Sequence, residues 1–235
     1  MATINGTNES NILYGTAWAD LIRGLDGDDR IYGRAGNDTI YGGDDHDSIW
    51  GENGDDVIVA GKGEDRVWGG AGHDRITDES GNDMLDGGDG NNLINAGEGN
   101  DTLRSGTGSD TINAGSGNDI VSSGAGGDRI FGLEGDDRID AGAGHDILIG
   151  GAGDDTLIGA DGDVWKLTLV ISGENLAQGF QGTTLVAFLS ALVNQRFTAT
   201  QYALFSSLVM LPVILALLGR RALAWNLGMR YHDPR

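Results

Sequence analysis

Hydrophobic side chains recur once in every nine positions along residues 24–158. The chain divides there into fifteen consecutive rows of nine residues without an insertion or deletion, beginning with GLDGDDRIY from Gly24 and GRAGNDTIY from Gly33. The eighth place of every row is Ile, Leu or Val, and the places beside it are mostly polar. One aliphatic residue between two mostly polar neighbours predicts a very short strand that buries a single side chain.

The other six residues of each row are predicted to form a turn. The fourth place is Gly in every row except at Asp45, and the sixth place is Asp except at Asn92. Glycine permits positive φ and a close approach of neighbouring backbone. One row then makes half a coil, two rows make a complete coil, and the coils stack on one another. The predicted fold class is an all-β parallel β-roll, a solenoid of two parallel sheets of short strands, with a thin core of eighth-place residues such as Ile31 and Ile40.

A change of composition near residue 163 predicts a domain boundary. Residues 1–163 carry 34 acidic and nine basic side chains, whereas residues 164–235 carry two acidic and six basic ones with long apolar runs. We therefore expect a region 1–23 with an N-terminal cap and degenerate repeats, a repeat region 24–163, and an appended α-helical hydrophobic segment 164–235. Tyr202–Gly219 has no charged residue and is about as long as the shortest membrane span, which needs roughly 17–25 residues.

The repeated aspartates predict a row of metal sites. Burying one aliphatic side chain per row contributes about 1.5–3 kcal/mol, which is less than the backbone entropy lost by nine residues at about 1–2 kcal/mol each. A cation between the turns would neutralise the stacked carboxylates and link one coil to the next. Calcium fits best, because it accepts several hard oxygen ligands in flexible geometry, whereas magnesium requires a stricter octahedron and zinc prefers His or Cys. The candidate ligands are the sixth-place aspartates Asp29, Asp38, Asp47, Asp56, Asp65, Asp74, Asp83, Asp101, Asp110, Asp119, Asp128, Asp137, Asp146 and Asp155.

Residues 6–163 resemble the calcium-binding nonapeptide Gly-Gly-x-Gly-x-Asp-x-aliphatic-x of RTX (haemolysin-type) proteins. The resemblance implies that calcium lies between turns two rows apart, so that Asp29 and Asp47 share an ion. It also implies type I secretion and folding on millimolar calcium outside the cell, where the chain would act as a scaffold or adhesin-like module. Sites around Asp45, Asp83 and Asn92 depart from the consensus and are expected to be weak or empty, whereas filled sites are expected mainly from Asp101 to Asp155.

A second resemblance concerns the hydrophobic segment. Gly173–Leu208 is similar to a late helix–loop–helix of a major-facilitator transporter, most of all to the muropeptide permease branch. It implies an alternative in which residues 164–219 contact the membrane and the chain is a membrane-anchored transporter fragment fused to an RTX module. One span, two spans and a soluble helical pair that caps the roll all remain open.

Four aromatic residues share the ninth place and recur at every second row: Tyr14, Tyr32, Trp50 and Trp68. They are expected to stack as a ladder on one outer face, where exposed aromatic rings are also candidates for contact with carbohydrate or protein.

Several classes of function are disfavoured. The net charge of −21 opposes binding to nucleic acid, and the absence of cysteine excludes disulfides and Cys-based sites. His46, His73 and His145 all occupy the fifth place and are interpreted as solvated turn residues that offer a carbonyl ligand. No Gly-x-Ser-x-Gly, His-Glu-x-x-His or P-loop motif occurs, so we do not expect an enzyme.

Overall fold

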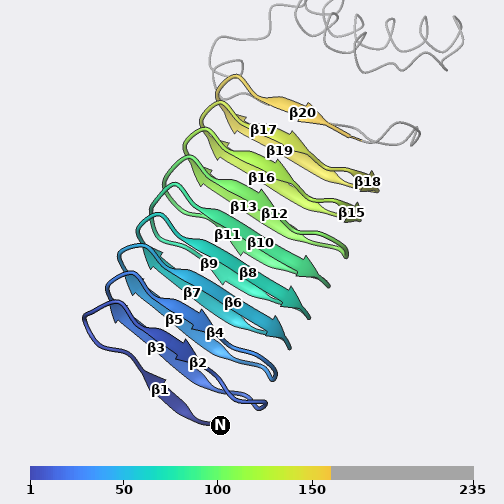
Figure 1. The fold of residues 1–235 in the computed structure, drawn as a ribbon. Coiled ribbons are helices and arrows are strands. Elements are labelled where there is room, and N and C mark those ends of the chain that lie inside the picture. The colour runs from blue at the N-terminus through green and yellow to red at the C-terminus, as the bar shows by residue number, and fades with distance from the viewer. Residues whose placement is uncertain (160–235) are drawn as a thin grey trace, which may run out of the picture. The chain divides into compact units, whose positions relative to one another are not determined.

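The computed structural model describes residues 1–159, which form a stack of parallel coils without an α-helix (Figure 1). The first sheet contains nine strands: β1 (Thr3–Asn5), β3 (Leu21–Asp26), β5 (Thr39–Asp44), β7 (Val57–Lys62), β9 (Arg75–Thr77), β11 (Leu93–Asn95), β13 (Thr111–Ser116), β16 (Arg129–Glu134) and β19 (Ile147–Ala152). The second sheet also contains nine: β2 (Ile12–Tyr14), β4 (Arg30–Tyr32), β6 (Ser48–Asn53), β8 (Arg66–Ala71), β10 (Met84–Asp89), β12 (Thr102–Arg104), β14 (Ile120–Ser122), β17 (Arg138–Asp140) and β20 (Thr156–Ile158). The short strands β15 (Ala125–Gly126) and β18 (Ala143–Gly144) pair separately.

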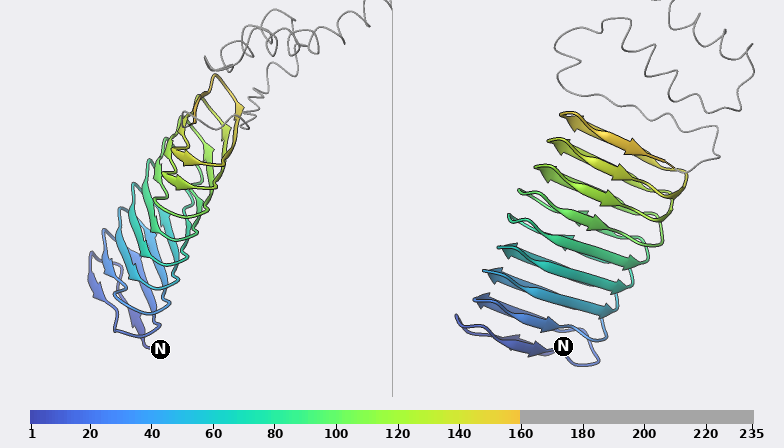
Figure 2. Two further views of the ribbon diagram at one scale, coloured as in Figure 1. Left: turned by 90° about the vertical axis from the view of Figure 1, so that its right-hand side faces the viewer. Right: turned by 45° about the horizontal axis from the view of Figure 1, so that its top comes forward.

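The register of both sheets equals two rows of the repeat, as the sequence predicts. Ile31 lies opposite Ile49 in the second sheet, and Ile40 lies opposite Ile58 in the first. The two views in Figure 2 show successive coils stacked with their strands parallel. β1 and β2 pair with β3 and β4 in the same register, so the looser rows before Gly24 also belong to the stack. The predicted β-solenoid with two parallel sheets is therefore confirmed for these residues.

Many strands are longer than the predicted three residues. β5, for example, continues past its buried Ile40 as far as Asp44 and pairs with β7 over this extra length. The extension includes Gly43 at a φ of 134°, opposite Gly61 at 125°. The stacked turns follow the same path, so their backbone amides and carbonyls also pair with the next coil. The prediction of a three-residue strand followed by an unpaired turn was therefore wrong for these rows.

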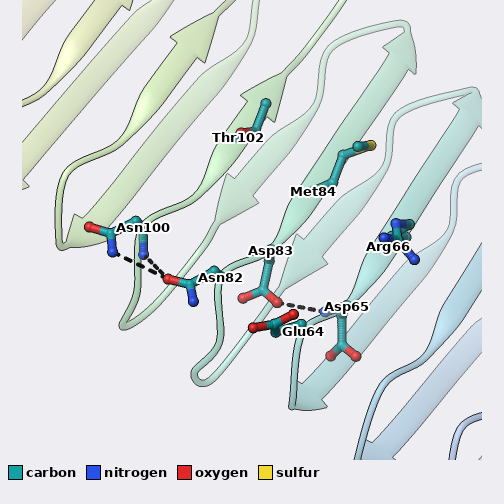
Figure 3. A pocket seen from close by; sticks show the side chains of 8 residues that line it. All are labelled: Glu64, Asp65, Arg66, Asn82, Asp83, Met84, Asn100 and Thr102. Atoms are coloured by element: carbon teal, nitrogen blue, oxygen red, sulfur yellow. Dashed lines mark hydrogen bonds between the residues drawn. The ribbon is translucent and has the colours of Figure 1, made fainter.

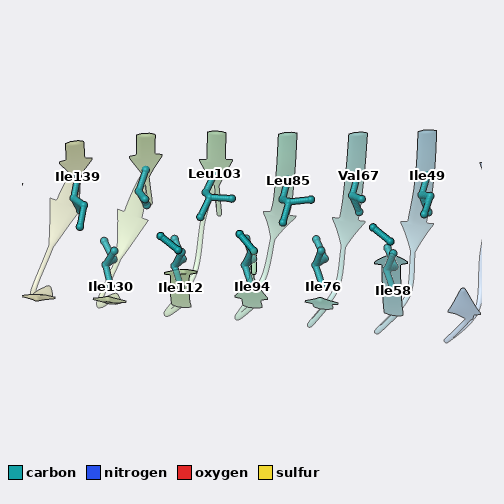
Figure 4. Packing of buried hydrophobic residues seen from close by; sticks show 14 of the residues in the cluster. Ile49, Ile58, Val67, Ile76, Leu85, Ile94, Leu103, Ile112, Ile130 and Ile139 are labelled. Atoms are coloured by element: carbon teal, nitrogen blue, oxygen red, sulfur yellow. The ribbon is translucent and has the colours of Figure 1, made fainter. Parts of the chain in front are cut away.

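The core is a double row of aliphatic side chains between the two sheets (Figure 4). Ile49, Val67 and Leu85 extend from the second sheet towards Ile58 and Ile76 of the first, and all five are fully buried. Small first-place residues such as Ala60 and Ala114 fill the space beside them. The core is one aliphatic residue wide on each side, so its stability depends on how the turns are held together.

The expectations for residues 164–235, including the helical segment, the transporter resemblance and the membrane contact, lie outside the described residues. Among residues 1–159, no helix has the length and apolar character needed to cross a membrane.

Candidate metal centres

The sixth-place aspartates form a continuous ladder along the stack. Each one directly precedes a strand, and its Oδ1 accepts a hydrogen bond from the backbone N–H of the sixth-place residue one coil earlier. The Asp47 amide donates to Asp65 Oδ1 at 2.7 Å, and the Asp56 amide donates to Asp74 Oδ1 at 2.9 Å. The two-row spacing therefore joins neighbouring coils through one oxygen of each carboxylate.

The second oxygen of these carboxylates is buried and has no hydrogen-bond partner. This holds for Oδ2 of thirteen of the fourteen predicted ligands: Asp29, Asp38, Asp47, Asp56, Asp65, Asp74, Asp83, Asp101, Asp110, Asp119, Asp128, Asp137 and Asp155. Asp146 is half-buried and does not share this feature. A buried anionic oxygen without a partner is costly, and a hard cation is the group that removes the cost. The residues present therefore fit calcium.

The first place of each row leaves room for this oxygen. It is Gly in eight of the fifteen rows, Ala or Ser in six, and Asp only at Asp78. A Cβ added at Gly51 would lie 2.5 Å from Asp56 Oδ2 and 2.5 Å from the carbonyl oxygen of Gly69 in the next coil. The space beside Gly51 is thus lined by one carboxylate oxygen and one carbonyl oxygen, which are the ligand types that calcium accepts.

Burial shifts the acidity of the ladder. It raises the pKa of Asp47 to about 8, and the pKa of Asp56, Asp101 and Asp137 to about 7. Like-charged carboxylates one coil away add to this effect, and the backbone N–H bond to each Oδ1 opposes part of it. The pKa values are raised because burial disfavours the charged form of these carboxylates.

Asn92 departs from the ladder in a way that agrees with a weak site. Its Oδ1 still accepts the Asp74 amide at 2.8 Å, but its Nδ2 donates to the Ser105 carbonyl at 3.3 Å. Both polar atoms of the amide therefore have partners. At Asp45, the side chain accepts the Gly27 amide at 3.1 Å, and the residue adopts a φ of 80° that glycine adopts more readily.

Asp20 is a further member of this ladder and is absent from the predicted ligands. Its Oδ1 accepts the Ala2 amide at 2.7 Å, and its own amide donates to Asp38 Oδ1 at 2.7 Å. Its Oδ2 accepts two bonds from Thr16, one from the backbone N–H and one from the hydroxyl. Asp20 thus has no free oxygen for an ion. The sixth-place aspartate of the row GTAWADLIR was the signal that could have placed it in the ladder.

The fifth-place residues form a second, outer ladder that the sequence analysis did not predict. His73 donates its amide to Asp55 Oδ1 at 2.8 Å, and its Nδ1 accepts the Asn91 amide at 2.8 Å. His46 Nδ1 accepts the Glu64 amide in the same way at 2.6 Å. A fifth-place side chain therefore accepts from the following coil, whereas a sixth-place aspartate accepts from the preceding one. His145 occupies the same exposed place. These histidines were interpreted as solvated turn residues, and in addition His46 and His73 act as hydrogen-bond acceptors.

A cluster of three carboxylates lies at the row that departs most from the consensus. One carboxylate oxygen from each of Asp65, Asp78 and Asp83 lies within 4.8 Å of the others, and all three residues are buried. Burial, and next the adjacent Asp83 carboxyl, raise the pKa of Asp78 to about 9. The weak or empty site expected around Asp83 stays a prediction, and the structure adds that Asp78, which replaces the first-place glycine of this row, places a third carboxylate beside Asp65 and Asp83.

A pocket of about 170 Å³ adjoins two members of this cluster, Asp65 and Asp83 (Figure 3). Its rim includes Asn82 and Asn100, and the Asn100 amide donates to Asn82 Oδ1 at 2.8 Å. The Asp65 amide donates to Asp83 Oδ1 at 2.7 Å across the same coils. The inner and outer ladders therefore both border this pocket.

The predicted aromatic ladder is present on the second sheet. The ring centroids of Tyr14 and Tyr32 are 5.1 Å apart, those of Tyr32 and Trp50 4.6 Å, and those of Trp50 and Trp68 4.9 Å, with nearly parallel planes. Contact with carbohydrate or protein at these residues stays a prediction. The stacking weighs against a sugar platform, because the ring faces contact one another and mainly the edges remain for a ligand.

The fold is a β-solenoid in which turns connect two parallel sheets and present carboxylate and carbonyl oxygens between stacked coils. These features define the class of calcium-binding β-solenoids. The family model of the RTX calcium-binding nonapeptide repeat matches seven stretches that together span residues 5–163: 5–40, 32–67, 41–76, 59–94, 68–103, 95–130 and 131–163. The chain belongs to this family. No curated protein matches it. The individual aspartates remain predicted ligands, and calcium is the ion that the family motif binds.

Proposed function

We propose that the repeat region is a non-enzymatic scaffold or adhesin-like module that folds when it binds calcium outside the cell. The buried, unpartnered Oδ2 atoms of the sixth-place aspartates are the observation that carries this proposal. Without cations the coils would stack these charges against one another in a core only one aliphatic residue wide on each side. The chain is then expected to stay disordered until an ion binds between the coils.

The extracellular location follows from calcium supply. Extracellular calcium modules bind their ions with dissociation constants of about 10⁻⁴–10⁻³ M, which free cytosolic calcium does not reach. A chain of net charge −21 without cysteine is then expected to remain unfolded before export and to fold afterwards without disulfides. This sequence of events agrees with type I secretion.

A non-enzymatic role is supported by the repetition itself. Nearly every carboxylate in the ladder has the same surroundings, whereas an acid–base pair requires two groups with different environments. The pocket beside Asp65 and Asp83 measures about 170 Å³, and small-molecule sites usually enclose roughly 300–1,000 Å³.

Calcium titration followed by circular dichroism tests the proposal. We expect a disordered spectrum in a calcium chelator and a cooperative gain of strand signal between about 0.1 and 10 mM calcium. Magnesium at the same concentrations serves as the control and is expected to give little signal, because it requires a stricter octahedron. An equal strand signal in chelator at pH 7.5, or none at about 10 mM calcium, would contradict the proposal. Secretion is tested separately by the fraction of the chain found in the culture medium.

A further inference from the structure

Asp78 stands where every other row from Gly24 to Ile158 has Gly, Ala or Ser. The first place of a row lies against the sixth-place carboxylate of the same row. A Cβ added at Gly69, for example, would lie only 2.5 Å from Asp74 Oδ2. A longer side chain at this place is directed at that carboxylate. The exception therefore adds a further acidic group directly beside the sixth-place carboxylate, where the other rows have a small residue.

The backbone around Asp78 is rearranged to hold this side chain. Asp78 Oδ1 accepts the Gly61 amide at 3.1 Å from the preceding coil. The second and fourth places of this row, Glu79 and Gly81, lack the positive φ that occurs at these places in every other row from Gly24 to Ile158. The carboxylate of Asp78 is thereby fixed rather than free to turn towards solvent, and the residue is 5% exposed.

The three carboxylates of the cluster each keep one oxygen without a hydrogen bond. Oδ2 of Asp65, Asp78 and Asp83 is buried and unpartnered, and the residues are 1%, 5% and 3% exposed. None of the three pairs with a basic side chain among residues 1–159. An ion with ligands at about 2.3–2.6 Å holds two oxygens at most about 4.6–5.2 Å apart, and the 4.8 Å limit of this cluster satisfies that condition.

We propose that Asp65, Asp78 and Asp83 form a specialised calcium site that differs from the repeated sites by a third carboxylate and binds its ion more tightly than they do. Calcium affinity rises with the number of charged ligands and with the rigidity of the site. The site joins the turn after β9 to the turns before β8 and β10, so its ion links both sheets and two neighbouring coils. The inference rests on the proposed calcium-dependent function and adds an order of filling, because this site is occupied first.

The test compares the full chain with two variants and a matched control. Asp78→Asn keeps the shape of the side chain and removes its charge, and Asp78→Gly restores the residue found in eight other rows. Glu79→Gln removes the same charge from an exposed neighbour. Equilibrium dialysis with radioactive calcium and native mass spectrometry count bound ions as calcium increases, and circular dichroism reports the strand signal of each chain.

We expect the first ion to bind the wild type and Glu79→Gln at a calcium concentration at least tenfold below that of the remaining ions. Both Asp78 variants should lose this early step, so that the ion between Asp65 and Asp83 binds together with the ions of the repeated sites, while each variant still gains strand signal. If either Asp78 variant folds and shows the same early step as the wild type, the specialised site does not exist and the cluster holds a proton instead. If the wild type neither binds calcium nor folds, the proposed function itself is wrong, which is a distinguishable result.

Discussion

Replacing Asn92 by Asp tests whether a single carboxylate oxygen creates a calcium site in this fold. Asn92 is 3% exposed and occupies the sixth place between Asp74 and Asp110 in the ladder. Its Oδ1 accepts the Asp74 amide, and an aspartate would retain that bond. Its Nδ2 donates to the Ser105 carbonyl at 3.3 Å, so Asn92→Asp would place a second acceptor against that carbonyl.

The expected magnitude follows from this exchange of a donor for an acceptor. Without calcium, a buried carboxylate oxygen that loses its partner destabilises the fold by about 1–3 kcal/mol. With calcium, the carboxylate oxygen that replaces Asn92 Nδ2 and the Ser105 carbonyl both become ligands, and binding stabilises the fold by RT ln(1 + [Ca]/Kd). A penalty of about 2 kcal/mol is offset when calcium reaches about 30 times the Kd of the new site. The variant is therefore less stable than the wild type at low calcium and more stable at high calcium.

Urea unfolding at several calcium concentrations measures the crossing, and equilibrium dialysis counts the ions. Asn118→Asp serves as the control, because it adds the same charge at an exposed fifth-place residue whose Oδ1 accepts the Asp136 amide. This control should show neither the crossing nor an extra ion. If Asn92→Asp is less stable at every calcium concentration and binds no additional ion, the sixth-place carboxylate does not act as a ligand, and the reasoning about the ladder is refuted.

Three further predictions concern the acidity, the core and the outer ladder. The folded-state pKa of Asp47 is about 8 and that of Asp56 about 7, both above the unfolded value near 3.8, so the calcium-free fold binds extra protons and gains stability as the pH falls from 8 to 5. Circular dichroism in chelator should accordingly show more strand signal at pH 5 than at pH 8. Calcium should bind more weakly at pH 6 than at pH 8, because protons compete for the same carboxylates. The opposite trends would contradict the burial of these groups. Ile112→Ala, at a fully buried core position, should lower the free energy of unfolding in saturating calcium by about 2–5 kcal/mol, and a loss below about 0.5 kcal/mol in urea unfolding would mean that the core is not closed there. His73→Leu removes the acceptor for the Asn91 amide and should cost about 1 kcal/mol in the same assay, whereas His73→Asn should be nearly neutral; equal losses in both would exclude a role of this hydrogen bond.

The register of the fold could be predicted from the sequence because the repeat has no insertion. Ile31, Ile40 and Ile49 occupy the same place in consecutive rows, and a two-sheet coil made of two rows is the arrangement that buries all of them. The lengths of the strands could not be predicted, since hydrophobic pattern reports buried side chains only. The extra residues of β5 up to Asp44 pair through their backbone, which leaves no trace in side-chain polarity.

The sequence predicts the repeated carboxylates and the rows that depart from the repeat, but not what each departing residue contributes in three dimensions. From the sequence alone, a departure from the repeat predicts a loss of ligands, and both polar atoms of the Asn92 amide are in fact paired within the protein. Asp78 shows that a departure can also add a carboxylate, because the first place points at the carboxylate of its own row. This direction depends on the path of the turn in three dimensions. His46 and His73 illustrate the same limit, since the spacing places them in the turn but does not show which amide they accept.

The comparison of Asn92 with its neighbours separates the geometric role of the ladder from its charge. Asn92 Oδ1 accepts the preceding coil's amide at 2.8 Å, as the aspartates do at 2.6–3.1 Å, so an uncharged amide is sufficient to join the coils. Asn92 Nδ2 also has a hydrogen-bond partner, whereas Oδ2 of the buried aspartates has none. If joining coils were the only requirement, asparagine would serve at every row and avoid a cost of about 1–3 kcal/mol per site. Aspartate at fourteen of the fifteen rows therefore requires a partner for the second oxygen, and a cation supplied from solution meets that requirement.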